Sequence, residues 1–372
     1  MIISPQSWGD MFLSKHHYAI ELARIDNWVY FLNPPLRVKS VSLERITIRQ
    51  SVQHPNLFII QHCLRFPYRL KFYYKSLFHW LMKFHVGKIL QKIPQSVDII
   101  WSFDLGNLYP FNLFPGSSVK IFHPVDEPRN NEAIDSAVGA HVMFSVTKEI
   151  LEKYVRFHIP KFLINHGLGT EFLTRTDPKR PSGKVRVGYS GNLLLDYIDR
   201  EILLLIIDDN PSVIFDFWGA YELTNNNIGG TMDCSTTLFI RALKARKNVF
   251  LHGAILLNLL SEALHTVDAF LICYDVQKEQ SKGTNCHKVM EFFSTGKVTI
   301  SSNLSSYAER PDLVVMVAER TDNKQLSRLF KEVILNLEVY NSDALKANRI
   351  TFAHDNTYAK QINRIEKIML RQ

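Results

Sequence analysis

Long apolar runs are missing from this sequence of 372 residues. No stretch reaches the roughly 18 to 20 uninterrupted apolar residues that a membrane-spanning helix needs. The first residues, MIISPQSWGDMFLSK, also lack the basic start and apolar stretch of a signal peptide. We therefore expect a cytoplasmic protein without a membrane span.

Cysteine is scarce, and its four copies are scattered. They are Cys63, Cys234, Cys273 and Cys286, with no C-x-x-C pair and no histidine at metal-ligand spacing. A disulfide framework and a zinc site are both unexpected from this pattern. Reduced structural thiols are the simpler interpretation.

Acidic residues are outnumbered, with 44 Lys and Arg against 36 Asp and Glu and a formal net charge of +8. Such a balance indicates an anionic partner, for which a diphosphate, a phospholipid surface and a nucleic acid all qualify. The length of 372 residues favours two domains, and a hydrophobic fraction of 46% is enough to fill two cores.

Short apolar runs alternate with longer amphipathic stretches, which is typical of βα units around a parallel sheet. The expected strands of a first domain are Met1–Ser4, Trp28–Leu32, Leu57–Ile60, Asp98–Phe103, Ser118–Phe122, His141–Ser145 and Phe162–Asn165. Those of a second domain are Val185–Tyr189, Val213–Trp218, Val249–Leu251, Ala269–Tyr274, Val298–Ser301 and Val314–Val317. The sequence predicts two doubly wound α/β domains in tandem.

A polar stretch rich in proline and glycine, Thr176–Gly183, separates the two groups of strands and is typical of a linker. We place a first domain at residues 1–176 and a second at 184–340. Residues 341–372 form a polar amphipathic helix that we expect to pack on the first domain.

The segment between the strands at 269–274 and 298–301 carries the strongest functional signal. Its polar start, Gly283, Thr284 and Asn285, can cap a helix that ends at Gly296. The apolar positions, spaced at i, i+3, i+4 and i+7, are Cys286, Val289, Met290 and Phe293. Lys288 and Glu291 then share the opposite face.

An exposed helix N-terminus binds anions, so Gly283–Asn285 are expected at a diphosphate, with Thr284 and Asn285 as donor-binding residues. Lys288 would add a full positive charge beside it. Glu291 is placed on the same face to accept hydrogen bonds from ribose hydroxyls. A lysine and a glutamate three residues apart are also common as a solvated surface pair, so the pair alone does not decide between the two interpretations.

The stretch KVMEFFSTGKVTISS, residues 288–302, resembles the donor-site motif of GT-B glycosyltransferases of the family 4-like group. In that group the glutamate binds the nucleotide's ribose and the basic residue approaches the phosphates, which by resemblance falls on Glu291 and Lys288. Many retaining members carry a further glutamate eight residues earlier, where this chain has Gly283. The resemblance therefore leaves open whether transfer inverts or retains the sugar's configuration.

A second stretch, VRVGYSGNL, resembles the family's loop at the cleft, and it assigns Gly191 and Asn192 to the donor. The resemblance implies two Rossmann-like domains facing across a cleft, with the C-terminal helix crossing back to the first. It also implies a hexosyltransferase-like enzyme of bacterial envelope or capsular polysaccharide synthesis, using a nucleoside-diphosphate sugar and a glycan or lipid-linked acceptor. We expect no cofactor and no metal, because no D-x-D motif in a suitable context occurs.

The first domain supplies the candidates for catalysis. His16 and His17 lie in WGDMFLSKHHYAIELAR, which resembles the family's first loop and helix, although both also suit a helix start. Asp126, in HPVDEP after an expected strand, is our first candidate for the base that an inverting transfer needs, and helix capping is its alternative. Asp104 is the second candidate.

The segment Arg65–Lys92 contains seven Lys or Arg residues, no acid and many interleaved aromatics. It fits an anionic membrane surface on the inner face of the plasma membrane. A domain with an aromatic core and solvated lysines explains it equally well. Nucleic acid is not expected, since no nucleic-acid-binding motif accompanies the pattern.

Two further hypotheses stay open. A nucleotide-sugar epimerase or hydrolase could use the same fold without an acceptor. A non-catalytic protein that binds membranes or nucleic acid through its basic surface is the other alternative.

Overall fold

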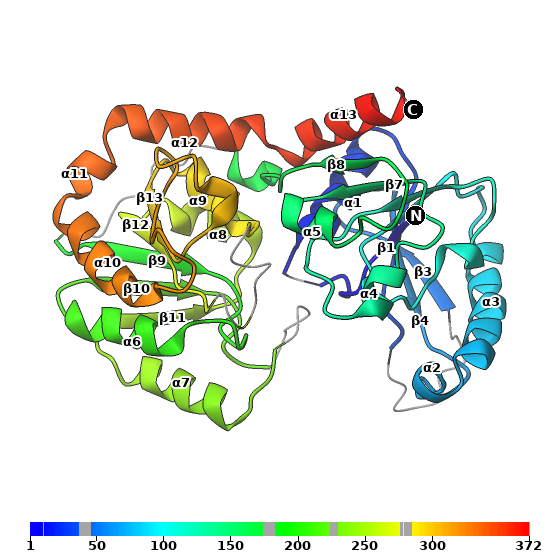
Figure 1. Ribbon diagram of the computed structural model, residues 1–372, viewed down its shortest axis with the longest axis horizontal. Helices are drawn as coiled ribbons and strands as arrows, with labels where there is room; N and C mark the ends of the chain where they lie inside the picture. Colours follow the sequence, from blue (N-terminus) through cyan, green and yellow to red (C-terminus); the bar gives the residue numbers. More distant parts are fainter. Residues whose placement is uncertain are drawn as a thin grey trace. The chain divides into compact units, whose positions relative to one another are not determined.

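The computed structural model describes residues 1–9, 11–36, 46–173, 183–223, 230–275, 278 and 285–371. The chain divides into two compact α/β units, drawn in Figure 1. The first comprises Met1–Trp8 and Lys15–Ile164, and the second comprises Gly9–Ser14 and Asn165–Gln372. Residues 176–182 of the expected linker lie outside the described residues.

The first unit is built on an eight-stranded sheet of order β3-β4-β2-β1-β5-β6-β7-β8. Its strands are β1 (Ile2–Ile3), β2 (Val29–Leu32), β3 (Ile46–Gln50), β4 (Leu57–His62), β5 (Ile99–Ser102), β6 (Val119–Phe122), β7 (Val142–Ser145) and β8 (Lys161–Leu163). All neighbours are parallel except β3, which pairs antiparallel with β4 at the edge of the sheet.

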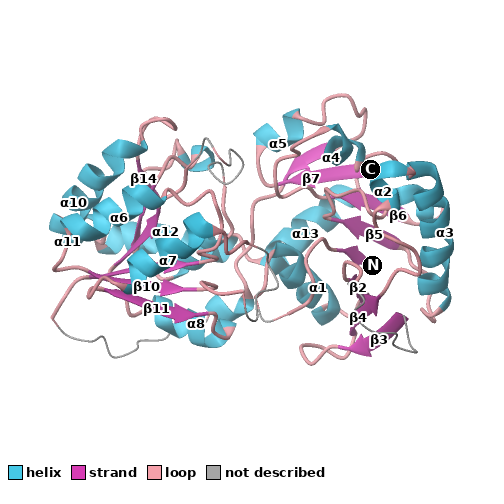
Figure 2. Ribbon diagram, turned by 90° about the horizontal axis from the view of Figure 1, so that it is seen from below, coloured by secondary structure: helices cyan, strands magenta, loops and turns pink. Residues whose placement is uncertain are grey.

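The helices from this part of the chain are α1 (Ser14–Arg24), α2 (Leu70–Tyr73), α3 (Lys75–Gln91), α4 (Asn131–Asp135) and α5 (Lys148–Glu152). A short 3-10 turn, η1 (Phe111–Leu113), follows β5. Figure 2 shows the strands of this unit stacked side by side with α3 along its outside.

The second unit has a six-stranded parallel sheet of order β11-β10-β9-β12-β13-β14. Its strands are β9 (Arg186–Ser190), β10 (Ile214–Trp218), β11 (Val249–Gly253), β12 (Ala269–Ile272), β13 (Val298–Ser301) and β14 (Val314–Met316). The chain builds outward from β9 in one direction and then continues with β12 on the other side of β9. This reversal is the topological switch point at which open α/β sheets bind ligands, beyond the carboxyl ends of the strands.

The helices of the second unit are α6 (Arg200–Asp209), α7 (Cys234–Lys244), α8 (Leu257–Leu264), α9 (Lys288–Ser294), α10 (Leu326–Leu335), α11 (Leu337–Tyr340), α12 (Asp343–Asp355) and α13 (Tyr358–Met369). The 3-10 turns are η2 (Thr170–Phe172), η3 (Ser305–Tyr307) and η4 (Asn323–Gln325). Among the described residues, no helix combines the length and the apolar character needed to cross a bilayer.

Every expected strand is present, so the predicted pair of doubly wound domains is confirmed. The strand β3 was missed because its sequence, ITIRQ, is short and becomes progressively more exposed toward Gln50. An edge strand with one solvated side does not give the continuous apolar run of a buried parallel strand.

A buried arginine ties the C-terminal segment to the second unit, where α12 packs against α9. Arg349 is fully buried, and its guanidinium donates hydrogen bonds to three backbone carbonyls. The acceptors are Leu313 at 3.2 Å, Gly296 at 3.1 Å and Tyr340 at 2.9 Å. Whether the segment 341–372 also packs on the first domain stays a prediction.

Arg349→Met should destabilise the second unit by about 3 kcal/mol, because three carbonyls lose a charged donor at once. For a unit of this size that loss lowers the melting temperature by about 6–12 °C. Scanning calorimetry measures the change. Lys331→Met, at an exposed position of α10, is the matched control and should leave the transition in place. Equal melting temperatures for the two variants would contradict this role of Arg349.

Candidate functional site

The residues predicted to bind an anion come together at the carboxyl ends of β9 and β12. Ser190 ends β9, and the loop that follows begins with Gly191 and Asn192. Lys288 and Glu291 lie on α9, in the crossover from β12 to β13. Gly283 and Thr284 lie outside the described residues.

The helix α9 begins later than the sequence indicated. It starts at Lys288, with His287 at its N-cap making no side-chain capping bond. The expected cap at Gly283–Asn285 is therefore wrong for Asn285, which precedes the helix and bonds elsewhere. Its amide donates to Asn165 Oδ1 at 2.8 Å and accepts from the Tyr307 hydroxyl at 3.2 Å.

Lys288 is a buried cation, with 5% of its surface exposed. Its ammonium lies 4.2 Å from the centre of the Tyr189 ring and 5.5 Å from that of Tyr274. No described residue accepts a hydrogen bond from it or pairs with it as a carboxylate. Aromatic faces offset part of the cost of burying the charge, but three N–H donors are left for an anion.

The ammonium lies directly against the backbone of Gly191. This glycine has φ +147°, and a Cβ added there would collide with Lys288 Nζ. The loop is held in place by backbone hydrogen bonds, from Gly191 N to the Trp218 carbonyl at 2.7 Å and from Leu193 N to the Ala220 carbonyl at 2.8 Å. Glycine at this position thus allows a ligand and a lysine to approach the chain closely.

Asn192 shapes the same loop from within. It is buried, and its side-chain oxygen accepts a hydrogen bond from Leu194 N at 2.9 Å. This is a local turn device of the kind that asparagine forms readily. The structure places Asn192 at the predicted site, with its carbonyl oxygen already in use.

Glu291 is a buried carboxyl that accepts a hydrogen bond from Ser190 Oγ at 3.4 Å. Burial raises its pKa to about 7, while the charge of Lys288 and the Ser190 hydrogen bond act in the opposite direction. Glu171 raises the pKa further by like-charge repulsion. A carboxyl with one long hydrogen bond retains acceptor capacity for a ligand's hydroxyls.

Sequence reasoning missed Glu171, Tyr189 and Tyr274. Glu171 lies in η2, and its Oε2 is buried without a hydrogen-bond partner in the described part of the chain. Tyr189 stands inside the VRVGYSGNL stretch, but a tyrosine in a strand gave no sign that its ring would contact a lysine about a hundred residues later in the chain. Only the folded sheet brings these groups together.

The candidates for catalysis lie in the first unit. His16 is fully buried, stacks on Phe31 with ring centres 5.0 Å apart, and has Nε2 3.2 Å from the Ser7 carbonyl. His17 is buried as well, and Asp126 is half-buried in the bend after β6. Their catalytic roles stay predictions.

Asp104 has a local structural role. Its carboxylate accepts hydrogen bonds from Gly106 N and Leu108 N, each at 2.8 Å. Burial raises its pKa, and these two backbone donors act against that shift. Both oxygens thus close the turn after β5, which weakens Asp104 as a candidate base.

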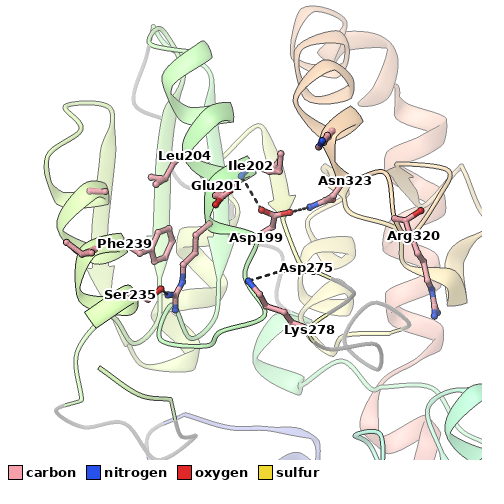
Figure 3. Close-up of a pocket in the computed structure, with 15 residues that line it drawn as sticks. Asp199, Glu201, Ile202, Leu204, Ser235, Phe239, Asp275, Lys278, Arg320 and Asn323 are labelled. Carbon is pink, nitrogen blue, oxygen red and sulfur yellow. Dashed lines mark hydrogen bonds and ion pairs between the residues drawn. The ribbon is translucent and has the colours of Figure 1, made fainter. Parts of the chain in front are cut away.

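A separate cavity of about 800 Å³ lies beside α6 and α7 in the second unit, shown in Figure 3. Some of its charged side chains bind other protein groups: Asp199 accepts from Asn323 at 2.6 Å, and Lys278 pairs with Asp275 at 3.1 Å. None of its lining residues belongs to the predicted donor set.

Comparison with known proteins gives a fold and no sequence family. No protein-family model matches the chain, and no curated protein matches it. Solved structures match over its whole length. Sucrose-phosphate synthase from Thermosynechococcus elongatus has a TM-score of 0.69 at 11% identity, covering 100% of this chain and 98% of that one.

Two other structures agree with the first. HepE of Anabaena, in complex with UDP and glucose, has a TM-score of 0.67 at 11% identity, with 100% and 99% of the chains covered. The lipopolysaccharide outer core galactosyltransferase WaaB has a TM-score of 0.61 at 14% identity, with 98% of each chain covered. The chain has the GT-B fold. Its predicted fold class is thereby confirmed.

Glu291→Gln should stabilise the ligand-free protein in a pH-dependent way. The folded-state pKa of Glu291, about 7, exceeds the ordinary value of 4.5, so ionising the buried carboxyl costs stability as pH rises between these values. The glutamine variant avoids this cost. We expect it to be more stable than the wild type by roughly 3 kcal/mol at pH 8, with little difference at pH 4.5. Thermal melts of both proteins across this range test it, and parallel profiles would contradict the pKa assignment.

Proposed function

We propose that the protein is a glycosyltransferase that moves a sugar from a nucleoside-diphosphate sugar to a hydroxyl. The observation that carries the proposal is the buried Lys288 ammonium, which forms no hydrogen bond or close ion pair with a described residue and lies against the Gly191 backbone, with Glu291 one turn further along α9. The GT-B fold supports it, and the HepE structures contain UDP or UDP-glucose.

In the proposed complex the diphosphate contacts Lys288 and the backbone at Gly191. Glu291 accepts hydrogen bonds from the ribose hydroxyls. The ammonium stabilises the negative charge that develops on the leaving diphosphate, and because it is already desolvated it does so more strongly than an exposed lysine would. Since Lys288 can offset this charge, we expect transfer to be independent of a divalent metal or cofactor. We also propose that the reaction is hexosyltransferase-like.

The acceptor's proton has to be removed as the new bond forms. If transfer inverts the sugar's configuration, a carboxylate or histidine of the first unit acts as the base, with Asp126 first, followed by His16 and His17. His16 is the weaker histidine, because its ring is packed in the interior.

We further propose a glycan or lipid-linked acceptor in polysaccharide biosynthesis, of the family 4-like envelope or capsular type. One structural neighbour, WaaB, is a galactosyltransferase of the lipopolysaccharide outer core. Action at the cytoplasmic side, with peripheral contact through Arg65–Lys92, belongs to the same proposal.

Lys288→Ala should weaken the binding of nucleoside diphosphates about tenfold or more, because their phosphates lose a charged partner. The binding of nucleosides, which have no phosphate, should be almost unaffected. Isothermal titration with UDP, GDP and ADP and the corresponding nucleosides measures this. Lys247→Ala, at an exposed position of the same unit, is the control. Undiminished diphosphate binding in Lys288→Ala would overturn the phosphate assignment.

Glu291→Ala tests recognition of the ribose. The wild type should prefer a ribonucleoside diphosphate over its 2′-deoxy and 3′-deoxy forms by about tenfold, since each missing hydroxyl leaves a buried acceptor unpaired. In Glu291→Ala this preference should disappear, whereas Lys288→Ala should keep it. A preference that survives in Glu291→Ala would place the ribose elsewhere.

Transfer itself is measured by release of nucleoside diphosphate from the preferred sugar donor, with and without a glycan or lipid-linked acceptor. Release that depends on the acceptor supports the proposal. Donor consumption at the same rate without any acceptor contradicts it and indicates a hydrolase or epimerase.

A further inference from the structure

The helix α3 of the first unit has apolar residues on two opposite faces. Its inward face packs into the core through Phe78, Met82, Val86 and Ile89, all of which are buried. Its outward face carries Leu77, Trp80 and Phe84, which are 46%, 57% and 56% exposed. Their spacing of i, i+3 and i+7 places them along one line of the helix surface.

Three further exposed aromatics lie at the junction of α2 and α3. Phe72, Tyr73 and Tyr74 are 61%, 78% and 65% exposed. Figure 1 shows the two helices adjoining each other at the outside of the first unit. We call the six side chains at 72, 73, 74, 77, 80 and 84 the aromatic face. So many large apolar side chains exposed on two adjoining helices are typical of an interaction site.

The segment that carries the aromatic face is basic, and no acidic residue occurs within Arg65–Lys92. Two of the lysines are used internally, since Lys71 and Lys75 lie 3.1 Å and 4.0 Å from Glu132. Four others are exposed and form no ion pair with a described residue, namely Arg65, Arg69, Lys83 and Lys88. On α3, Lys83 and Lys88 flank the line of Trp80 and Phe84 on opposite sides.

We propose that the aromatic face docks on an anionic lipid bilayer. Trp and Tyr favour the level of the lipid headgroups because each combines an apolar ring with a polar group, and flanking lysines and arginines contact lipid phosphates. A nucleic acid fits less well, because Trp80 and Phe84 pack edge to face on each other, with ring centres 4.7 Å apart, instead of presenting open stacking platforms.

The docking stands independently of glycosyl transfer, because it rests on a surface of the first unit alone. Together with the proposed function, docking specifies the acceptor more closely, because an enzyme held at a bilayer meets hydroxyls carried by membrane lipids. Failure of the docking would leave nucleoside-diphosphate binding by the second unit untouched, so the two failures can be told apart.

The test is co-sedimentation of the full chain with vesicles of phosphatidylglycerol and phosphatidylcholine, and with vesicles of phosphatidylcholine alone. We expect binding to the anionic vesicles that weakens at high salt. The Trp80→Ser/Phe84→Ser double variant should lose roughly tenfold or more of this binding. Trp28→Ser is the matched control, since Trp28 is also in the first unit and is 53% exposed.

Two further measurements keep the result decisive if the double variant folds poorly. Trp80→Phe should bind vesicles like the wild type, yet lose the blue shift of tryptophan fluorescence that insertion of Trp80 produces. Lys83→Glu/Lys88→Glu should weaken binding and reduce its salt dependence.

Undiminished binding of the Trp80→Ser/Phe84→Ser variant in its folded form would overturn the proposal, as would equal binding to neutral vesicles. The proposal would also be overturned if the wild type did not bind vesicles but formed a dimer or bound an oligonucleotide, and if Trp80→Ser abolished that association. Those results would assign the aromatic face to a second copy of the chain or to nucleic acid.

Discussion

The buried ammonium of Lys288 is the constraint around which the second unit's site is arranged. An unpaired charge in the interior is costly, and the chain lowers this cost with the rings of Tyr189 and Tyr274. The nearby carboxyl of Glu291 does not cancel the charge fully, because burial holds the pKa of Glu291 near 7. Among the described residues the charge of Lys288 is therefore balanced only in part, which supports the phosphate-binding role that we propose.

The strand pattern could be predicted well because a strand buried on both faces has a continuous run of apolar residues. Runs such as AFLI in β12 and VTIS in β13 are buried at every position. The edge strand β3 was not predicted because its sequence, ITIRQ, is not a continuous apolar run. The start of α9 was also misplaced, since Asn285 can cap a helix in sequence but is bonded to Asn165 and Tyr307 in the structure.

The pair Lys288 and Glu291 could be found from sequence because one short helix carries both. Their surroundings could be predicted only in part. Ser190 stands in the stretch that resembles the cleft loop, whereas Glu171 and the two tyrosines gave no sign in sequence of their contact with the pair. Burial changes the chemistry of the pair more than spacing does: on a solvated helix these side chains would form an ordinary surface ion pair. In the first unit, burial likewise makes His16 an interior residue, whereas the resemblance of its stretch to the family's first loop and helix had made it a candidate for catalysis.

For the segment Arg65–Lys92, composition left two interpretations open, an aromatic core and a membrane-binding surface. The exposure of each aromatic side chain in the structure distinguishes between them. An aromatic core with solvated lysines would have placed the rings inside. Phe78 does lie inside, but Phe72, Tyr73 and Trp80 remain exposed. The same helix thus contributes to the core on one side and presents an apolar surface on the other.

The central claim is that the Lys288 site binds a nucleoside diphosphate, and the most direct measurement is thermal unfolding with a panel of nucleoside diphosphates and their sugars. A ligand at a hundred times its dissociation constant stabilises the folded state by about 2.7 kcal/mol. We predict a rise in melting temperature that is selective for one base and requires the diphosphate. No shift with any member of the panel, or equal shifts with inorganic phosphate alone, would contradict it.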